Sequence, residues 1–142
     1  MDQDAVQLMI AQDRKEWVLL ADLLDSHVDQ PLHKSGPPWN SRDVYAHLAR
    51  WLEHSNADME AYPSLSIVSF TPAQVEDLNA RWQREDSSLG QSEARLKAAL
   101  ALERRLAIIA AIPLDRWDEQ LTRIAHFDGA DHFAIHRSYI SG

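Results

Sequence analysis

Cysteine is absent from this 142-residue sequence. Its absence excludes disulfide bonds, metal sites built on thiolates and a cysteine nucleophile. Any thiol that takes part in the chemistry of this protein therefore has to come from another molecule.

Long apolar runs are missing too. No window approaches about eighteen consecutive apolar residues, so we expect no transmembrane helix and no membrane partner. The N-terminal stretch from Met1 to Leu8 is acidic and lacks the basic start and apolar run of a signal peptide. We therefore expect a cytoplasmic protein.

Positive charge is scarce. The chain carries 14 Lys and Arg against 22 Asp and Glu, which gives a formal net charge of -8, and the basic residues are interspersed with acidic ones. Nucleic-acid binding requires a cationic surface, so we expect no nucleic-acid partner. A chain of this length is typical of one domain with a single core, and we expect residues 1–142 to form that domain.

Glycine and proline are few, with four and six copies respectively, and the prolines cluster where helical periodicity breaks. This distribution predicts a few long helices with defined joints. Apolar residues at spacings of three and four predict the first helix from about Asp4 to Val28. Asp13, Lys15 and Asp22 are expected on its other faces. Its apolar face is expected to contain Val6, Met9, Ile10, Trp17, Leu20, Leu24 and Val28.

The second helix is expected to begin at Asn40 or Ser41. A cap residue followed three positions later by an acid, here Asp43, forms a capping box. The helix should end near Ala61, before a Tyr-Pro pair. Its apolar face contains Val44, His47, Leu48, Trp51 and Ser55. A histidine, His47, thus interrupts an otherwise apolar stripe.

Further helices are expected at about 71–86, 96–112 and 130–140, with an extended loop at 64–70 and an uncertain segment at 114–127. Asp128 is a candidate N-cap for the last helix. The helix at 96–112 is expected to bury Leu96, Ala99, Leu100, Glu103, Leu106, Ile109 and Ala110.

These elements predict an all-α fold, a four-helix bundle with one longer crossover connection. Most tryptophans recur on the apolar faces of the predicted helices. The residues expected in the core are Trp17, Trp51, Trp82 and Trp117.

Three histidines predict a metal site. His132 and His136 are four residues apart on the predicted last helix, so both rings lie on one face and can reach one ion. His47 is the candidate third ligand, from a facing helix. Three neutral imidazoles leave coordination positions for water or substrate, which is typical of catalytic rather than structural sites.

Each of these residues also has a simpler interpretation. A single histidine on an apolar face, such as His47, is often a hydrogen-bonded core residue, and a pair four residues apart can be a solvated part of a helix surface. His54 and His126 could support a site without binding the ion themselves. Arg50, Arg137 and His54 are candidates for orienting an anionic group of a substrate.

The segment Trp39-Asn-Ser-Arg-Asp-Val-Tyr-Ala-His-Leu-Ala-Arg-Trp51 resembles the second-helix pattern of the DinB/YfiT-like superfamily of four-helix bundles, in which a Trp-Ser/Thr-x-x-Asp/Glu-x-x-x-His-Leu run supplies a metal histidine. The tail from His132 through His136 to Ile140 is similar to the last-helix His-x-x-x-His pattern of that superfamily. The stretch 78–86 resembles members that include the ClbS/DfsB-like branch. The likeness covers most of the chain.

The resemblance implies that His47, His132 and His136 bind a divalent metal such as zinc, nickel or iron. Members of the superfamily include thiol-dependent S-transferases and a maleylpyruvate isomerase that uses mycothiol or bacillithiol, and members of the ClbS-like branch protect against a genotoxin.

From this resemblance we expect a metal-dependent enzyme that activates a low-molecular-weight thiol or water. The nucleophile would be transferred to, or would hydrolyse, an electrophilic small molecule, as in detoxification. The alternative is a metal-free protein of the same fold that binds or sequesters a small molecule and confers resistance to it. A homodimer is expected, because two-fold pairing is common among oligomers; a purely structural dimer would be a third possibility.

Overall fold

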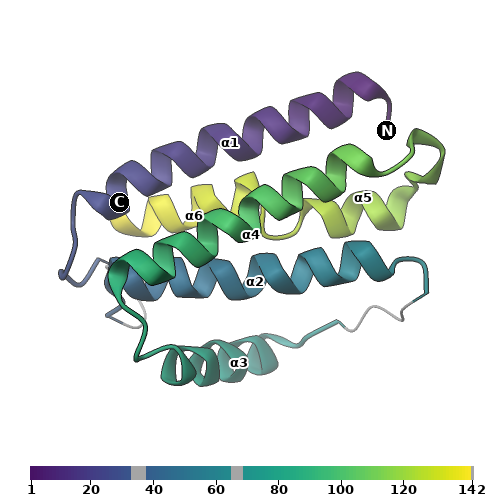
Figure 1. Ribbon diagram of the computed structural model, residues 1–142. Coiled ribbons are helices and arrows are strands. Elements are labelled where there is room, and N and C mark those ends of the chain that lie inside the picture. The colour runs from purple at the N-terminus through teal and green to yellow at the C-terminus, as the bar shows by residue number, and fades with distance from the viewer. Residues whose placement is uncertain (33–37, 65–68, 142) are drawn as a thin grey trace.

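Helices make up about three quarters of residues 1–32, 38–64 and 69–141, the part of the chain that the computed structural model describes (Figure 1). They are α1 (Gln3–Asp25), α2 (Ser41–Ala61), α3 (Pro72–Glu85), α4 (Gln91–Ala111), the short 3-10 helix η1 (Leu114–Arg116), α5 (Glu119–His126) and α6 (Ala130–Ser141). No strand occurs within those residues, so the predicted all-α class is confirmed. None of the helices described is long and apolar enough to cross a membrane.

The ends of α2 follow the predicted local signals. The Asn40 side chain accepts a hydrogen bond from the backbone N–H of Asp43 at 2.9 Å, and the Asp43 carboxylate accepts one from the backbone N–H of Asn40 at 3.1 Å. The predicted capping box is therefore confirmed, and α2 ends at Ala61 as expected. In contrast, α1 already ends at Asp25, so Val28 lies beyond it and is exposed. Positions 65–68 of the predicted extended loop lie outside the described residues.

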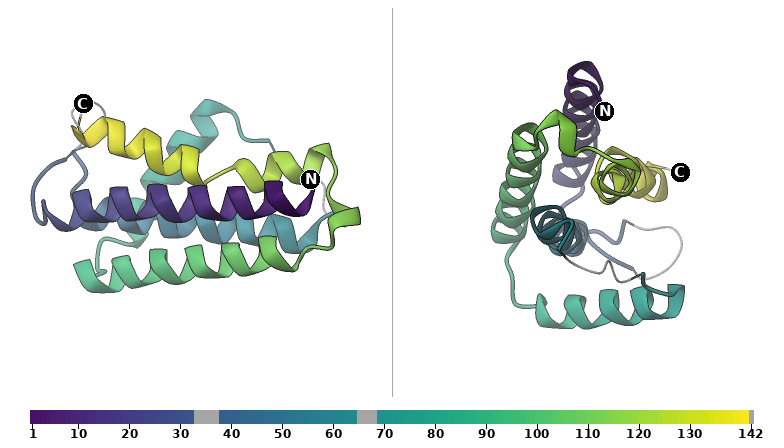
Figure 2. Two further views of the ribbon diagram at one scale, coloured as in Figure 1. Left: turned by 90° about the horizontal axis from the view of Figure 1, so that it is seen from above. Right: turned by 90° about the vertical axis from the view of Figure 1, so that its right-hand side faces the viewer.

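The helices α1, α2 and α4 and the consecutive pair α5 and α6 run roughly along one direction, whereas α3 lies across them beside α2 (Figure 2). In the packing, α2 contacts α4, α1 contacts α6, and α3 contacts α2. Because α3 has no fully buried residue, it covers the core from outside and adds little to it. Large buried residues of the core include Leu20, Leu24, Leu48, Leu52, Leu102 and Phe133.

The buried face of α4 differs from the predicted one. Leu96 and Leu100 are 57% and 60% exposed, whereas Ala94 and Ala98 are completely buried. The prediction was wrong because it gave most weight to large apolar side chains when it assigned the buried face of the helix. Small side chains at a helix contact allow a short distance between axes, and α4 packs on α2 through its alanines.

Two charged residues in the core also contradict the predicted pattern. Asp13, expected outside the apolar face of α1, is 2% exposed, and Arg105 of α4 is 1% exposed. Glu103, which was expected to be buried, is exposed instead and pairs with Arg14 across 2.8 Å. Asp13 and Arg105 pair with each other, which is the condition for burying charges in a core.

The tryptophans divide between the core and a more open region. Trp117 is buried as predicted, and Trp17 packs partly buried against the core. Trp51 and Trp82 are only half-buried, so the prediction of a core role is wrong for these two. Their rings meet edge to face where α3 crosses α2, with centroids 5.0 Å apart.

We expect Ala98→Leu to destabilise the fold and Leu100→Ala to leave its stability nearly unchanged. Ala98 has no exposed surface, so the added methyl groups should cost about 1–3 kcal/mol of unfolding free energy. Leu100 is mostly exposed, and its truncation should change that free energy by less than about 0.5 kcal/mol. Urea unfolding followed by circular dichroism measures both values. A larger loss of unfolding free energy in the Leu100 variant than in the Ala98 variant would contradict the observed buried face of α4.

Candidate metal centre

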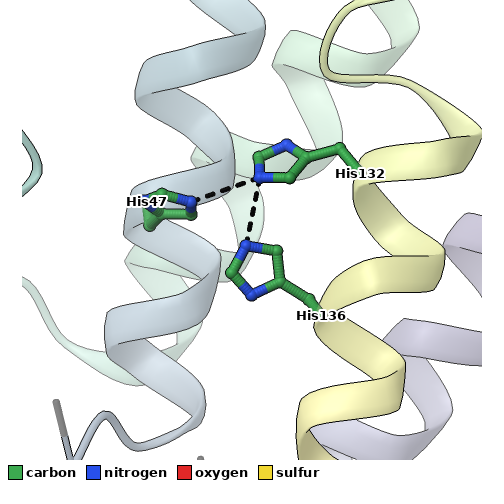
Figure 3. A group of neighbouring side chains, drawn as sticks. All are labelled: His47, His132 and His136. Atoms are coloured by element: carbon green, nitrogen blue, oxygen red, sulfur yellow. Dashed lines mark hydrogen bonds between the residues drawn. The ribbon is translucent and has the colours of Figure 1, made fainter. Parts of the chain in front are cut away.

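Three imidazole rings converge between α2 and α6 (Figure 3). The Nε2 atom of His132 lies 3.3 Å from Nε2 of His47 and 3.1 Å from Nε2 of His136. The potential ligand atoms of the three residues all lie within 4.8 Å of one another. The structure thus brings together the three ligands predicted from the sequence, and this cluster could hold a metal ion.

The chemistry of the rings and two of their nitrogen separations fit a divalent cation. Two nitrogens bound to one zinc ion at about 2.0–2.1 Å and at the tetrahedral angle are about 3.3 Å apart, close to the two Nε2 separations observed. A neutral imidazole nitrogen carries either one hydrogen or one lone pair. Nε2 of His132 can therefore form a regular hydrogen bond with only one of its two neighbours, whereas an ion could accept lone pairs from all three rings.

Asp128 lies behind His132, on the side of the ring opposite the cluster. Nδ1 of His132 is buried 3.4 Å from the Asp128 carboxylate, without the geometry of a hydrogen bond, and the other carboxylate oxygen accepts a hydrogen bond from Ser55. A carboxylate beside Nδ1 favours the tautomer that has its lone pair on Nε2, the nitrogen that faces the other rings. The arrangement is typical of histidines that bind metals.

The protonation state of His132 also suits a ligand. Burial lowers the pKa of His132, and the Asp128 carboxylate only partly offsets this effect. The ring is thus held in the neutral form that metal binding requires. Burial likewise raises the pKa of Asp128, against the opposing influence of His132.

Asp128 was predicted as the N-cap of the last helix, and that role is wrong. The first backbone N–H of α6, from Ala130, donates to the Asp13 carboxylate of α1 at 2.9 Å, while the Asp128 carboxylate contacts Ser55 and His132. One signal in the sequence could have indicated the observed role. Asp128 precedes His132 by four residues, which is the spacing for contact along a helix.

The pair of Asp13 and Arg105 fixes where α6 begins. Nε of Arg105 donates to the Asp13 carboxylate at 2.9 Å, and its terminal nitrogens donate to the backbone carbonyls of Ala125 and Phe127. The other Asp13 oxygen accepts from the N–H of Ala130. One buried ion pair therefore holds both the end of α5 and the start of α6, two residues before His132.

The chain passes very close to this pair at Gly129. A Cβ atom there would lie 2.7 Å from the Asp13 carboxylate and closer still to the Arg105 guanidinium, so only glycine fits without a shift of the ion pair. The preceding residue, Asp128, has φ of 64°, a left-handed conformation that aspartate tolerates better than most residues. These two residues break the helical direction between α5 and α6.

The three histidines lie on the wall of a cavity of about 980 Å³ between α2, α3 and the α5–α6 pair. This volume is at the upper end of the range for sites that bind small molecules. Other residues of its lining include Trp39, Trp51, His54, Asp58, Phe70 and Tyr139.

The remaining candidate residues differ in their relation to the cavity. His54 lines it. Arg50 binds Asp86 at 2.8 Å, and Arg137 binds Glu16 at 2.9 Å, so these guanidinium groups connect α2 with the end of α3 and α6 with α1. Neither arginine is among the lining residues of the cavity. His126 is exposed on α5 and does not reach the site.

Comparisons with models of protein families, with curated proteins and with solved structures give no significant match. What the fold and the site define is a class, an all-helical protein with a three-histidine cluster that could hold a metal ion. The function therefore has to be argued from the site itself.

We expect Gly129→Ala to lower stability and to weaken metal binding together. The new methyl group displaces the ion pair that positions α6, which should cost on the order of 1–3 kcal/mol of unfolding free energy. Gly90→Ala is the control for metal binding, because nothing lies within 4 Å of a Cβ atom at that position and the substitution affects only the N-cap of α4. Thermal unfolding and zinc titration measure both effects. Equal behaviour of the two variants would contradict this role for Gly129.

We expect Asp128→Asn to weaken zinc binding by roughly 10- to 100-fold, because the carboxylate no longer orients the His132 ring. Asp131→Asn removes the same charge from an exposed position in the first turn of α6 and should leave affinity nearly unchanged. Competition with a chromogenic zinc chelator measures both affinities. Unchanged binding in the Asp128 variant, with its metal-free melting temperature preserved, would rule out the supporting role.

Proposed function

We propose that this protein is a metal-dependent enzyme of the DinB/YfiT-like class. In this proposal the fold is a four-helix bundle in which α5 and α6 together form the fourth member and α3 belongs to a longer crossover connection. The observation that carries the proposal is the convergence of His47, His132 and His136 on the wall of a cavity large enough for a small-molecule substrate.

His47, His132 and His136 would hold the ion. A divalent cation supplies Lewis-acid chemistry, which lowers the pKa of a bound thiol or water and makes it a nucleophile at neutral pH. Three imidazoles are compatible with zinc, nickel and iron. Because the chain has no cysteine, a thiol nucleophile would come from a separate low-molecular-weight compound.

Neighbouring aromatic residues hold the histidine rings in place. The Trp39 ring packs against His47 with centroids 4.8 Å apart, and Tyr139 packs edge to face against His136 at 5.9 Å. Aromatic packing limits rotation of the His47 and His136 rings, and the Asp128 carboxylate lies beside Nδ1 of His132. Ligands held in place by their neighbours favour the binding of a cation.

His54 is the titratable group placed to assist a reaction in the cavity. Its ring packs against Trp51 and Phe70, which also contact each other, and its Nε2 is 3.6 Å from the Asp58 carboxylate. An imidazole beside a carboxylate is suited to accept a proton from, or donate one to, a substrate. In the proposed enzyme His54, about two helical turns along α2 from His47, exchanges a proton with the part of the substrate that lies toward Asp58.

The alternative is a metal-free protein that binds a small molecule in the same cavity. The cavity itself favours this function, since its aromatic walls can hold a ligand whether or not an ion is present. In that case the three histidines only line the wall. The two functions differ in whether the cluster binds metal and in whether the bound compound is converted.

Metal binding tests the proposed function directly. We expect zinc or nickel at about a hundredfold excess over the dissociation constant to stabilise the protein by about 2.7 kcal/mol, which corresponds to a rise in melting temperature of roughly 5–10 °C. His47→Ala should abolish the rise, because one of the three ligands is lost. His126→Ala, which removes an exposed histidine outside the cluster, should preserve it.

Differential scanning calorimetry with and without each metal, together with elemental analysis of the purified protein, gives the result. A metal-free preparation whose melting temperature does not respond to zinc or nickel would contradict the enzyme proposal and leave the binding protein as the function. Metal-dependent turnover that requires added thiol would distinguish transfer from hydrolysis.

A further inference from the structure

One wall of the cavity is a rigid aromatic surface centred on Trp51. The indole N–H of Trp51 donates to the Asn79 side chain at 2.8 Å, which ties this ring of α2 to α3. The rings of Trp82 and Phe70 pack edge to face against it, with centroids 5.0 and 6.2 Å away. An aromatic surface held in this way is preorganised to stack on a ring or to bind a cation.

The charged side chains of the cavity have one sign. Its lining contains the carboxylates of Asp58, Glu76 and Asp128, and no lysine or arginine is among the described lining residues. The nearby Arg50 is engaged by Asp86 and Glu85, with its guanidinium 5.8 Å from the Trp82 ring centroid. An anionic ligand would therefore meet carboxylates without a basic partner.

The carboxylates are not equivalent. Asp128 is engaged by Ser55 and His132, close to the histidine cluster. Asp58 has only His54 beside it, at 3.6 Å, among the contacts of the described residues, and Glu76 is exposed on α3. Two carboxylates of the lining thus remain accessible to a ligand.

Asp58 lies far from His47 along α2. It follows His47 by eleven residues (58 − 47), which at about 1.5 Å per residue is about 16 Å along the helix axis. Phe70, just before α3, packs against His54 at 5.6 Å, so the start of α3, which carries Glu76, lies toward the same end of the cavity. The cavity therefore has the three candidate metal ligands and Asp128 toward one end, and His54, Asp58 and Glu76 toward the other.

We infer that the cavity binds a ring-containing small molecule with a cationic group, an amine or a quaternary ammonium, at the end remote from the three histidines. The ring stacks on the Trp51 wall and the cationic group pairs with Asp58 and Glu76. This assignment rests on the proposed function, in that it places the reacting end of the molecule at the histidine cluster. It also replaces the expectation that Arg50 and Arg137 orient an anionic group of the substrate.

Three naphthalene compounds that differ in charge test the inference. They are 1-naphthylmethylamine, which is a cation at pH 7, the neutral 1-naphthalenemethanol and the anionic 1-naphthoate. Isothermal titration calorimetry is performed with EDTA present, because a carboxylate could also coordinate a metal ion. We expect the amine to bind at least about tenfold more tightly than 1-naphthoate, with the alcohol between them.

Two double variants separate the cavity from the overall negative charge of the protein, which itself attracts cations. Asp58→Asn with Glu76→Gln should reduce the preference for the amine to less than about threefold. Glu53→Gln with Asp77→Asn removes two charges from exposed positions of the same helices that do not line the cavity, and it should preserve the preference. Thermal melting confirms that all variants fold.

Tighter or equal binding of 1-naphthoate, an equal loss of preference in both double variants, or no binding of any naphthalene compound would overturn the inference. Because these measurements are made without metal, they succeed or fail independently of the metal-binding test. Preference for the amine in a protein that binds neither zinc nor nickel would retain the ligand assignment and reject the metal-dependent reaction.

Discussion

The buried ion pair of Asp13 and Arg105 is the interaction on which the rest of the structure depends. It connects α1 and α4 to the joint between α5 and α6. The Arg105 guanidinium donates to the Asp13 carboxylate and to the backbone carbonyls of residues 125 and 127, and the Asp13 carboxylate also accepts from the backbone N–H of residue 130. Removing one partner of such a pair typically costs about 3–5 kcal/mol, because the other charge stays buried without compensation. The specificity of these contacts, more than any net gain in stability, determines where α6 begins.

The break between α5 and α6 is what makes the histidine cluster possible. If α5 and α6 formed one uninterrupted helix, Asp128 would have a helical backbone and would lie one turn before His132. Here the left-handed backbone of Asp128 and the missing side chain of Gly129 redirect the chain, and the Asp128 carboxylate faces both Ser55 of α2 and the His132 ring. The same break that orients α6 therefore supplies the group that orients one of the candidate ligands.

Sequence patterns predicted the features that depend on neighbouring residues. The capping box at Asn40 and the placement of His132 and His136 on one face follow from spacings of three or four residues, and the end of α2 follows from the Tyr-Pro pair after Ala61. The pairing of Asp13 with Arg105 joins positions 92 residues apart, and no local pattern shows that two isolated charges will meet in the core. The buried face of α4 was predicted wrongly for a related reason. Alanine is compatible with both buried and exposed positions, so its role became evident only from the packing against α2.

The charge distribution of the cavity links the two proposals. The candidate metal ligands are neutral imidazoles, so a divalent ion among them would keep its charge, with Asp128 as the nearest carboxylate. That end of the cavity then favours an anionic nucleophile such as a thiolate, while Asp58 and Glu76 favour a cation at the other end. A substrate whose electrophilic atom and cationic group are separated by roughly the distance from His47 to Asp58 would be bound in one orientation, with its reactive end at the imidazoles. The opposite orientation would place the cation beside the metal ion, where repulsion disfavours it.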